Sequence, residues 1–114
     1  MATFVAACAP TRPTGDDLGI AARNLAAARA AGAETYAPLE LRAAEDHLAQ
    51  ANAASAQQDY DRMTMLAAES AVDSELAAAK SRLGKAREAV ESLKQQNADL
   101  SRDAARHAEG ASLE

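Results

Sequence analysis

The sequence predicts an all-α fold, a three-helix antiparallel bundle or hairpin whose long third helix projects as a coiled-coil-like extension. Two features of the composition lead to this prediction. Aromatic residues make up only 3% of the chain and tryptophan is absent, so a thick globular core is not expected. The chain is rich in alanine, glutamate, lysine, leucine and arginine, which is typical of long helices and coiled coils. At 114 residues the chain forms one domain at most.

The first helix is expected at about 16–31, at the start of a helical domain that covers 16–108. The segment Thr14-Gly15-Asp16-Asp17 offers an N-cap oxygen, and its two acids place negative charge at the positive end of the helix dipole. Leu18, Leu25 and Gly32 repeat every seven residues and mark a narrow apolar stripe. Gly32 is the expected stop, because glycine adopts the left-handed cap conformation at little cost.

The second helix is expected at 38–57, after a connection at 33–37. Pro38 suits the first turn of a helix, where its missing N–H is not needed. The apolar stripe of this helix has spacings of three and four. It consists of Leu41, Ala44, Leu48 and Ala51.

The third helix is expected at 60–107, with Asp59 as its N-cap. One continuous helix from Pro38 onward is the alternative, because residues 55–59 contain neither glycine nor proline. Within 60–107 only Gly84 weakens the helix, at a cost of about 1 kcal/mol relative to alanine. Residues 109–114 are expected to form a disordered tail, and Leu113-Glu114 resembles a remnant of cloning.

The second half of the third helix carries a heptad pattern that predicts partner binding. Leu76, Leu83, Val90 and Asn97 occupy one heptad position, and Ala79, Ala86, Leu93 and Leu100 occupy the other. In a parallel homodimer Arg82 of one copy would meet Arg87 of the other, so self-association is possible without being favoured by charge. A partner helix with an acidic edge would suit better. The predicted partner-binding residues are Leu83, Val90, Leu93, Asn97, Leu100, Lys80, Arg87 and Lys94.

Charge and cysteine content exclude several classes of function. The formal net charge is −5, whereas a nucleic-acid-binding domain shows a basic face. A single cysteine excludes an intrachain disulfide and argues against a thiolate metal cluster. No apolar run is long enough to span a bilayer, so any attachment to a membrane is expected to come through lipid.

The segment Val5-Ala6-Ala7-Cys8 has the pattern of a bacterial lipoprotein cleavage site. Small residues precede the cut, and the thiol of Cys8 would receive the diacylglycerol. We therefore predict lipidation at Cys8, with 1–7 as the remnant of a signal peptide. An ordinary cysteine in a flexible tail is the alternative, because 1–7 lacks a basic region and is shorter than a complete signal.

Residues 8–15 are expected to form a flexible tether, because they include two prolines and a glycine. At about 3.3 Å per residue, the part after Cys8 would reach roughly 20 Å. Ala9 follows Cys8, and no acidic residue is present there to suggest retention at the inner membrane. The expected location is therefore the periplasm, anchored to the outer membrane.

Residues with reactive side chains do not form a catalytic pattern. His47 and His107 have no histidine or cysteine partner at ligand spacing. The helical serines have no base near them in the sequence; they are Ser70, Ser74 and Ser81. We expect a protein that is not an enzyme, with no cofactor, no metal and no small-molecule substrate.

From Leu25 to about Arg82 the sequence resembles a small Ala-rich helical domain of unknown function found in proteobacterial envelope lipoproteins. The resemblance rests mainly on Tyr36-Ala37-Pro38-Leu39-Glu40-Leu41 and Asp59-Tyr60-Asp61. In that family the domain occurs alone after a lipoprotein signal, or ahead of a peptidoglycan-binding OmpA-like domain. Gln58 departs from the pattern, in which a glycine usually precedes the Asp-Tyr pair. The resemblance implies a fold and a location, and it implies no activity.

Together these observations favour a non-enzymatic, lipid-anchored helical protein of the periplasm and outer membrane, with a structural or adaptor role in the cell envelope. The alternative is a soluble helical protein-interaction module, either tetratricopeptide-like or an accessory to a chaperone or secretion system. The Asp59-Tyr60-Asp61 turn is similar to that of a tetratricopeptide hairpin. One such hairpin normally needs about three repeats to bury its apolar face, and no second copy is present.

Overall fold

The computed structural model describes residues 10–13 and 15–113, and these contain helices but no strand. The helices are α1 (Asp17–Ala31), α2 (Ala33–Tyr36), α3 (Pro38–Ala56) and α4 (Tyr60–Ser112). The predicted all-α class with a long C-terminal helix is therefore confirmed. The chain divides after Ser81 into two units, and α4 contributes to both.

Local signals in the sequence set both ends of α1. The carboxylate of Asp16 caps the helix by accepting from the Gly19 N–H at 3.2 Å. Gly32 ends the helix as predicted, with a φ of 96° that lies in the left-handed region and favours glycine. The connection expected at 33–37 contains one further short helix, α2, whose Tyr36 N–H bonds the Gly32 carbonyl.

The turn between α3 and α4 separates the two helices, so the alternative of one continuous helix is wrong. The Asp59 N–H bonds the Ala54 carbonyl at 2.9 Å, and the Gln58 N–H bonds the Ser55 carbonyl at 3.0 Å. This pair of bonds is the Schellman motif, which needs a left-handed residue after the cap. Gln58 takes that conformation with a φ of 60°. Asp59 then caps α4 by accepting from the Arg62 N–H at 3.3 Å.

The C-terminal part of α4 is longer than expected. The helix ends at Ser112, five residues beyond the predicted 107, and the predicted disordered tail at 109–114 is wrong for 109–112. The segment contains helix-favouring alanine and glutamate, and Gly110 keeps helical geometry at a cost of about 1 kcal/mol. The Ser112 hydroxyl also donates to the Glu109 carbonyl at 2.8 Å.

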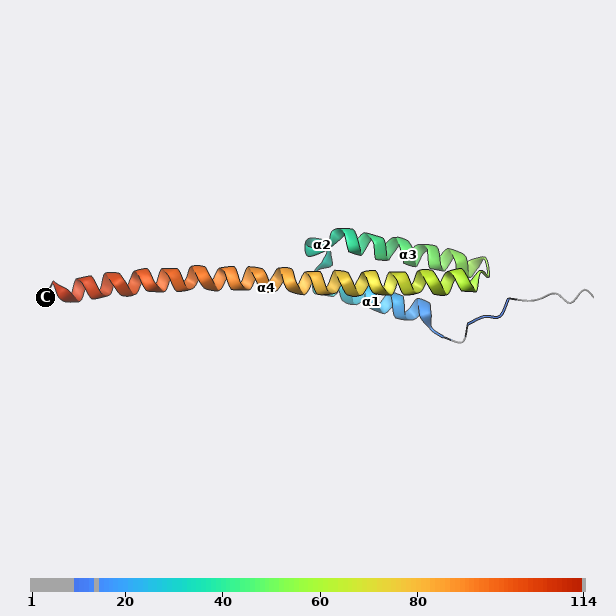
Figure 1. Cartoon of the computed structure of the whole chain (residues 1–114), viewed down its shortest axis with the longest axis horizontal. Coiled ribbons are helices and arrows are strands. Elements are labelled where there is room, and N and C mark those ends of the chain that lie inside the picture. The colour runs from blue at the N-terminus through green and yellow to red at the C-terminus, as the bar shows by residue number, and fades with distance from the viewer. Residues whose placement is uncertain (1–9, 14, 114) are drawn as a thin grey trace, which may run out of the picture. The chain divides into compact units, whose positions relative to one another are not determined.

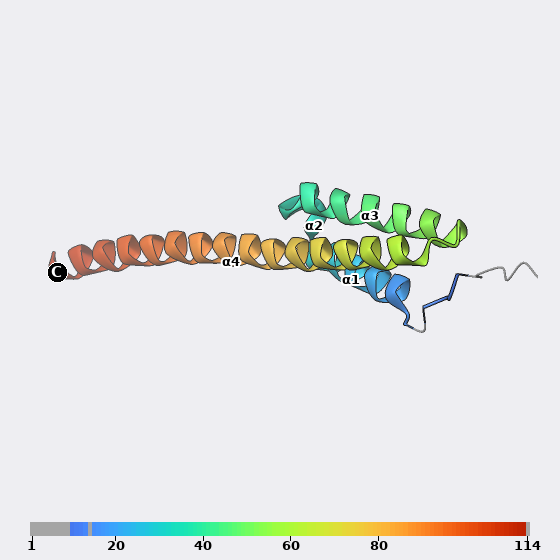
Figure 2. The same ribbon diagram turned by 45° about the vertical axis from the view of Figure 1, so that its right-hand side comes forward.

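In the first unit, α1 and α3 both lie beside the first part of α4 (Figures 1 and 2). The α3 helix runs antiparallel to α4, because residues near the start of α3 contact residues well beyond the start of α4. Glu40 bonds Lys80, and Ala44 bonds Ser70. The α1 helix runs parallel to α4, since Asp17 accepts from Thr64 and Glu75 accepts from Asn24. The result is an up-down-up arrangement of three helices.

The core of this unit is built from small residues. One buried cluster joins Leu25 and Leu41 with alanines of α1–α4, and the other surrounds Met63 and Leu66. In the α3 stripe predicted from sequence, Leu48 is partly buried and the other three residues are buried. Alanine at so many contact positions lets the helix backbones approach closely.

None of the helices in the described residues is long and apolar enough to cross a membrane.

Candidate partner-binding site

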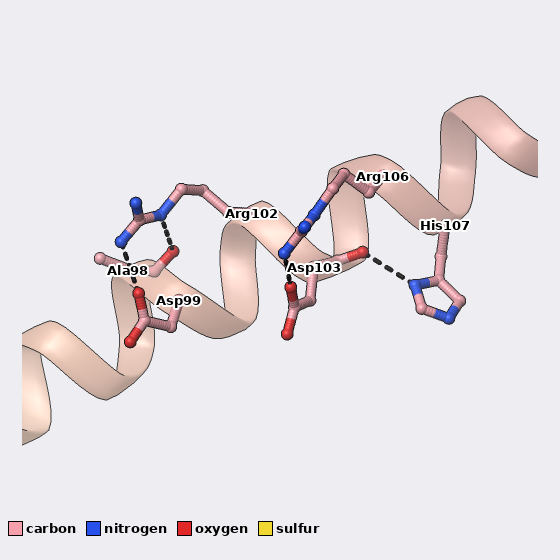
Figure 3. Close-up of polar contacts among 6 residues, drawn as sticks. All are labelled: Ala98, Asp99, Arg102, Asp103, Arg106 and His107. Carbon is pink, nitrogen blue, oxygen red and sulfur yellow. Dashed lines mark hydrogen bonds and ion pairs between the residues drawn. The ribbon is translucent and has the colours of Figure 1, made fainter.

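The second unit consists of the last part of α4, and every side chain described from Lys85 to Leu113 is exposed. The side-chain hydrogen bonds and ion pairs described within this segment join residues three or four positions apart. Arg102 pairs with Asp99, Arg106 pairs with Asp103, and the His107 ring donates to the Asp103 carbonyl at 3.0 Å (Figure 3). Pairs at this spacing each stabilise a helix by about 0.2–0.5 kcal/mol. This is little support for a long helix, because most helical stability in proteins comes from packing an apolar face.

Such an apolar face is present and lies open to solvent. We call it the distal seam, and it consists of Leu83, Val90, Leu93, Asn97 and Leu100. Its four aliphatic side chains are between 50% and 66% exposed. Leu76, which continues the heptad toward the N-terminus, is 46% exposed and lies in the first unit. All five predicted apolar and amide residues are thus accessible to a partner.

The distal seam uses different heptad positions from the buried face of α4. In the first unit the buried residues of α4 include Ser70, Ala77 and Ser81. Steps of seven from Ala77 and Ser81 lead to Gly84 and Glu88, which offer no apolar side chain. Apolar residues are found instead at the distal-seam positions. The residue pattern that packs against α1 and α3 therefore ends at Ser81, and apolar residues occupy different heptad positions beyond it.

The cationic row predicted beside the seam is only partly available. Lys80 lies in the first unit and donates to the carboxylate of Glu40, so it does not act with the other two cations. This hydrogen bond holds the pKa of Glu40 below its ordinary value. Lys94 lies 3.9 Å from Glu91, one turn away, and both it and Arg87 are exposed. The row beside the distal seam therefore reduces to Arg87 and Lys94.

A polar cluster between α3 and α4 was missed by sequence reasoning. The Nδ1 of His47 lies 2.8 Å from Asp73 Oδ2, and its Nε2 lies 3.6 Å from Glu69 Oε2. The imidazole is about one third exposed. Glu69 and Asp73 are one turn apart on α4. The signal in the sequence was the turn between α3 and α4, because aligning the two helices antiparallel about that turn places both acids near His47. Within the described residues no group of three or more His, Cys, Asp or Glu side chains could hold a metal ion.

The three helical serines are fully buried, which sequence reasoning did not predict. The Ser70 hydroxyl donates to the Ala44 carbonyl of α3 at 2.7 Å, and the Ser81 hydroxyl donates to the Ala77 carbonyl of its own helix at 2.7 Å. The Ser74 hydroxyl has no partner among the described residues. These side chains act as small packing residues along the α4 core face.

Cys8, the predicted lipidation site, lies outside the described residues, as do the other residues of the Val5-Ala6-Ala7-Cys8 segment. The tether expected at 8–15 is described at 10–13 and at Gly15, where Pro10 is exposed and Pro13 is partly buried. The lipid attachment stays a prediction.

Comparison with known proteins identifies the chain by family alone. No curated protein and no solved structure shows significant similarity to it. Residues 16–93 match a family described as a domain of unknown function, DUF4398. The match begins at the cap of α1 and ends within the distal seam, at Leu93. Since it covers more than half of the 114 residues, the chain belongs to the DUF4398 family, as the resemblance to a domain of unknown function predicted.

Proposed function

We propose that this protein is a non-enzymatic, lipid-anchored helical protein of the bacterial envelope, with a structural or adaptor role. The first unit serves as a small rigid bundle, and the second unit binds a protein partner through the distal seam. The observation that carries the proposal is the open apolar face of α4 from Leu83 to Leu100. Contiguous exposed apolar surface on a soluble domain marks a site of interaction.

The placement in the envelope is supported by the sequence around Cys8. Small residues before a lone cysteine suit signal cleavage and thiol lipidation, and a proline-containing tether follows. One acyl chain alone holds a protein only marginally, whereas several chains on one cysteine give stable attachment. In the expected location, lipid on Cys8 would anchor the protein to the outer membrane from the periplasmic side.

The same seam would equally serve a soluble helical interaction module, which is the second candidate. The two candidates differ at Cys8. The first requires a mature protein that begins at Cys8 and carries lipid, and the second requires an unmodified thiol.

Intact mass spectrometry on the native gene product separates these candidates. The gene is expressed with its own upstream sequence in a Gram-negative host, and the protein is extracted from the membrane fraction. The expected mass is that of a chain starting at Cys8 plus a diacylglyceryl and an N-acyl group. The Cys8→Ser variant is the matched control and should lose both the lipid and the membrane fraction. An unmodified mass in the soluble fraction would refute the anchor.

The adaptor role is tested by photo-crosslinking in the same cells. A photoreactive amino acid is placed at Leu93, on the distal seam, or at Ala98, which is exposed on α4 outside the seam. We expect protein adducts from position 93 and few from position 98. Equal labelling at both positions, or none at either, would contradict a partner-binding role for the seam.

A further inference from the structure

We infer that the partner of the distal seam is a second copy of this chain, and that residues 83–107 of the two copies pair as a parallel, in-register, two-stranded coiled coil. This inference deepens the proposed function, on which it rests for the assignment of the seam as a binding surface. It does not depend on lipid at Cys8.

From Val90 to Leu100, the apolar residues at the two heptad positions favour two parallel strands. Val90 stands at the first heptad position, while Leu93 and Leu100 stand at the second. A β-branched residue at the first position with leucine at the second is the combination that favours parallel dimers over higher oligomers. All three side chains are more than half exposed in the single chain.

Asn97 indicates which kind of helix packs against the distal seam. It occupies the first heptad position, between Leu93 and Leu100, so a partner helix would cover its amide. An amide both donates and accepts hydrogen bonds. A second Asn97 directly opposite supplies both functions, whereas an apolar helix would leave the amide unpaired at a cost. Only a parallel, in-register copy places Asn97 against Asn97, and a single asparagine at this position is known to specify register.

The structure weakens the charge argument for an acidic partner, because it removes one of the three cations. Of the three cations that suggested such a partner, Lys80 is bonded to Glu40 in the first unit. Lys94 lies near Glu91 of its own helix. In the parallel pair, the flanking contacts of Lys94 and Ser101 are with Ala89 and Gln96, which are uncharged. One repulsive contact remains, Arg82 against Arg87.

The pairing should be weak and dependent on concentration. Residues 83–107 span only about three and a half heptads, close to the shortest pattern that supports a coiled coil. The second heptad position also holds Ala86 in place of a larger side chain at the start of this segment. We expect dissociation constants on the order of tens of micromolar, tightened wherever chains are held together on one surface.

Sedimentation equilibrium of the full chain under reducing conditions tests the pairing. From about 1 to 300 µM the mass should rise from 11.8 kDa toward twice that value, with a parallel rise in helicity. The Leu93→Gln variant should stay monomeric across this range, and Ala98→Gln should behave like the parent chain. Leucine and glutamine have similar helix propensities, so the first change acts on the seam. A parent chain that stays monomeric at 300 µM would overturn the inference.

The Arg87→Glu variant distinguishes a second copy from an acidic partner. It replaces the one repulsive contact by an attractive pair with Arg82, so self-association should tighten several-fold. Weaker association in Arg87→Glu would contradict the parallel arrangement.

Disulfide crosslinking tests the orientation of the two paired helices directly, and it is measured in a Cys8→Ser background. A cysteine replacing Ala104, which continues the first heptad position, should form crosslinked dimers readily. A cysteine replacing its neighbour Ala105 should not. Equal crosslinking at both positions would refute in-register pairing.

The two proposals fail separately. If the parent chain is monomeric but position 93 still forms protein adducts in cells, the self-pairing inference is refuted and the adaptor role stands. If the protein dimerises but carries no lipid, the lipid anchor is refuted and the coiled-coil pairing stands.

Discussion

Replacing Ser74 with alanine should stabilise the protein, whereas the same replacement at Ser70 should destabilise it. Both side chains are fully buried on the core face of α4. The Ser70 hydroxyl donates to the Ala44 carbonyl at 2.7 Å and so joins α4 to α3, while the Ser74 hydroxyl has no partner in the part of the chain that the structure describes. The two substitutions remove the same atom from the same helix, so the difference between them isolates the hydrogen bond.

The size of the difference follows from the cost of a buried polar group. A hydrogen bond contributes about 0.5–1.5 kcal/mol net, and an unpaired buried group costs about 1–3 kcal/mol. Alanine gains roughly 0.5 kcal/mol in helix propensity at either site. Ser70→Ala should therefore lose about 0.5 kcal/mol, and Ser74→Ala should gain about 1.5–3.5 kcal/mol. Because the propensity gain is common to both, the separation of about 2–4 kcal/mol comes from the hydroxyl environments.

Urea unfolding followed by circular dichroism measures this separation, at a protein concentration of about 1 µM where self-association is negligible. The midpoint should shift with an unchanged slope if only stability has changed. Ser81→Ala is the matched control, because its hydroxyl bonds only a carbonyl of its own helix, and it should stay within about 0.5 kcal/mol of the parent chain. If Ser70→Ala is as stable as Ser74→Ala, the reasoning is refuted.

Three further predictions concern the first unit. Gln58→Gly should raise the free energy of unfolding in urea by about 0.5–1 kcal/mol, because Gln58 has a left-handed φ of 60° that strains a non-glycine residue. Gln57→Gly is the control and should lower the free energy of unfolding, because Gln57 has an ordinary φ of −85°. A change of the same sign in both variants would contradict backbone strain at Gln58. Glu40→Gln should destabilise at neutral pH. The hydrogen bond from Lys80 lowers the folded pKa of Glu40 from its ordinary value of 4.5, so its contribution is present above pH 4.5 and is lost as the pH falls through the folded pKa. The free energies of unfolding of the parent chain and of Glu40→Gln, measured from pH 2 to 7, should therefore converge at acid pH. A difference that persists at pH 2 would argue against the pairing of Glu40 with Lys80. A double-mutant cycle of His47→Ala and Asp73→Asn should give a coupling of about 0.5–1 kcal/mol, and no coupling would show that their 2.8 Å contact contributes nothing to stability.

The sequence alone determined the end of α1, the start of α4 and the apolar face of the second unit. Gly32 and Asp59 act through the backbone groups next to them, so their effect at the ends of α1 and α4 can be read from the residue type. The heptad spacing of Val90, Leu93 and Leu100 is likewise local, because it depends only on the pitch of one helix.

Tertiary structure decided which residues of different helices meet. The pairing of Lys80 with Glu40 and of His47 with Asp73 depends on how far α3 slides along α4, and no single helix contains that information. The same holds for Ser70, whose burial and bond to Ala44 follow from the close approach of two small-residue faces. The left-handed conformation of Gln58 was decided in the same way. The antiparallel return of the chain requires it even though glutamine does not favour it.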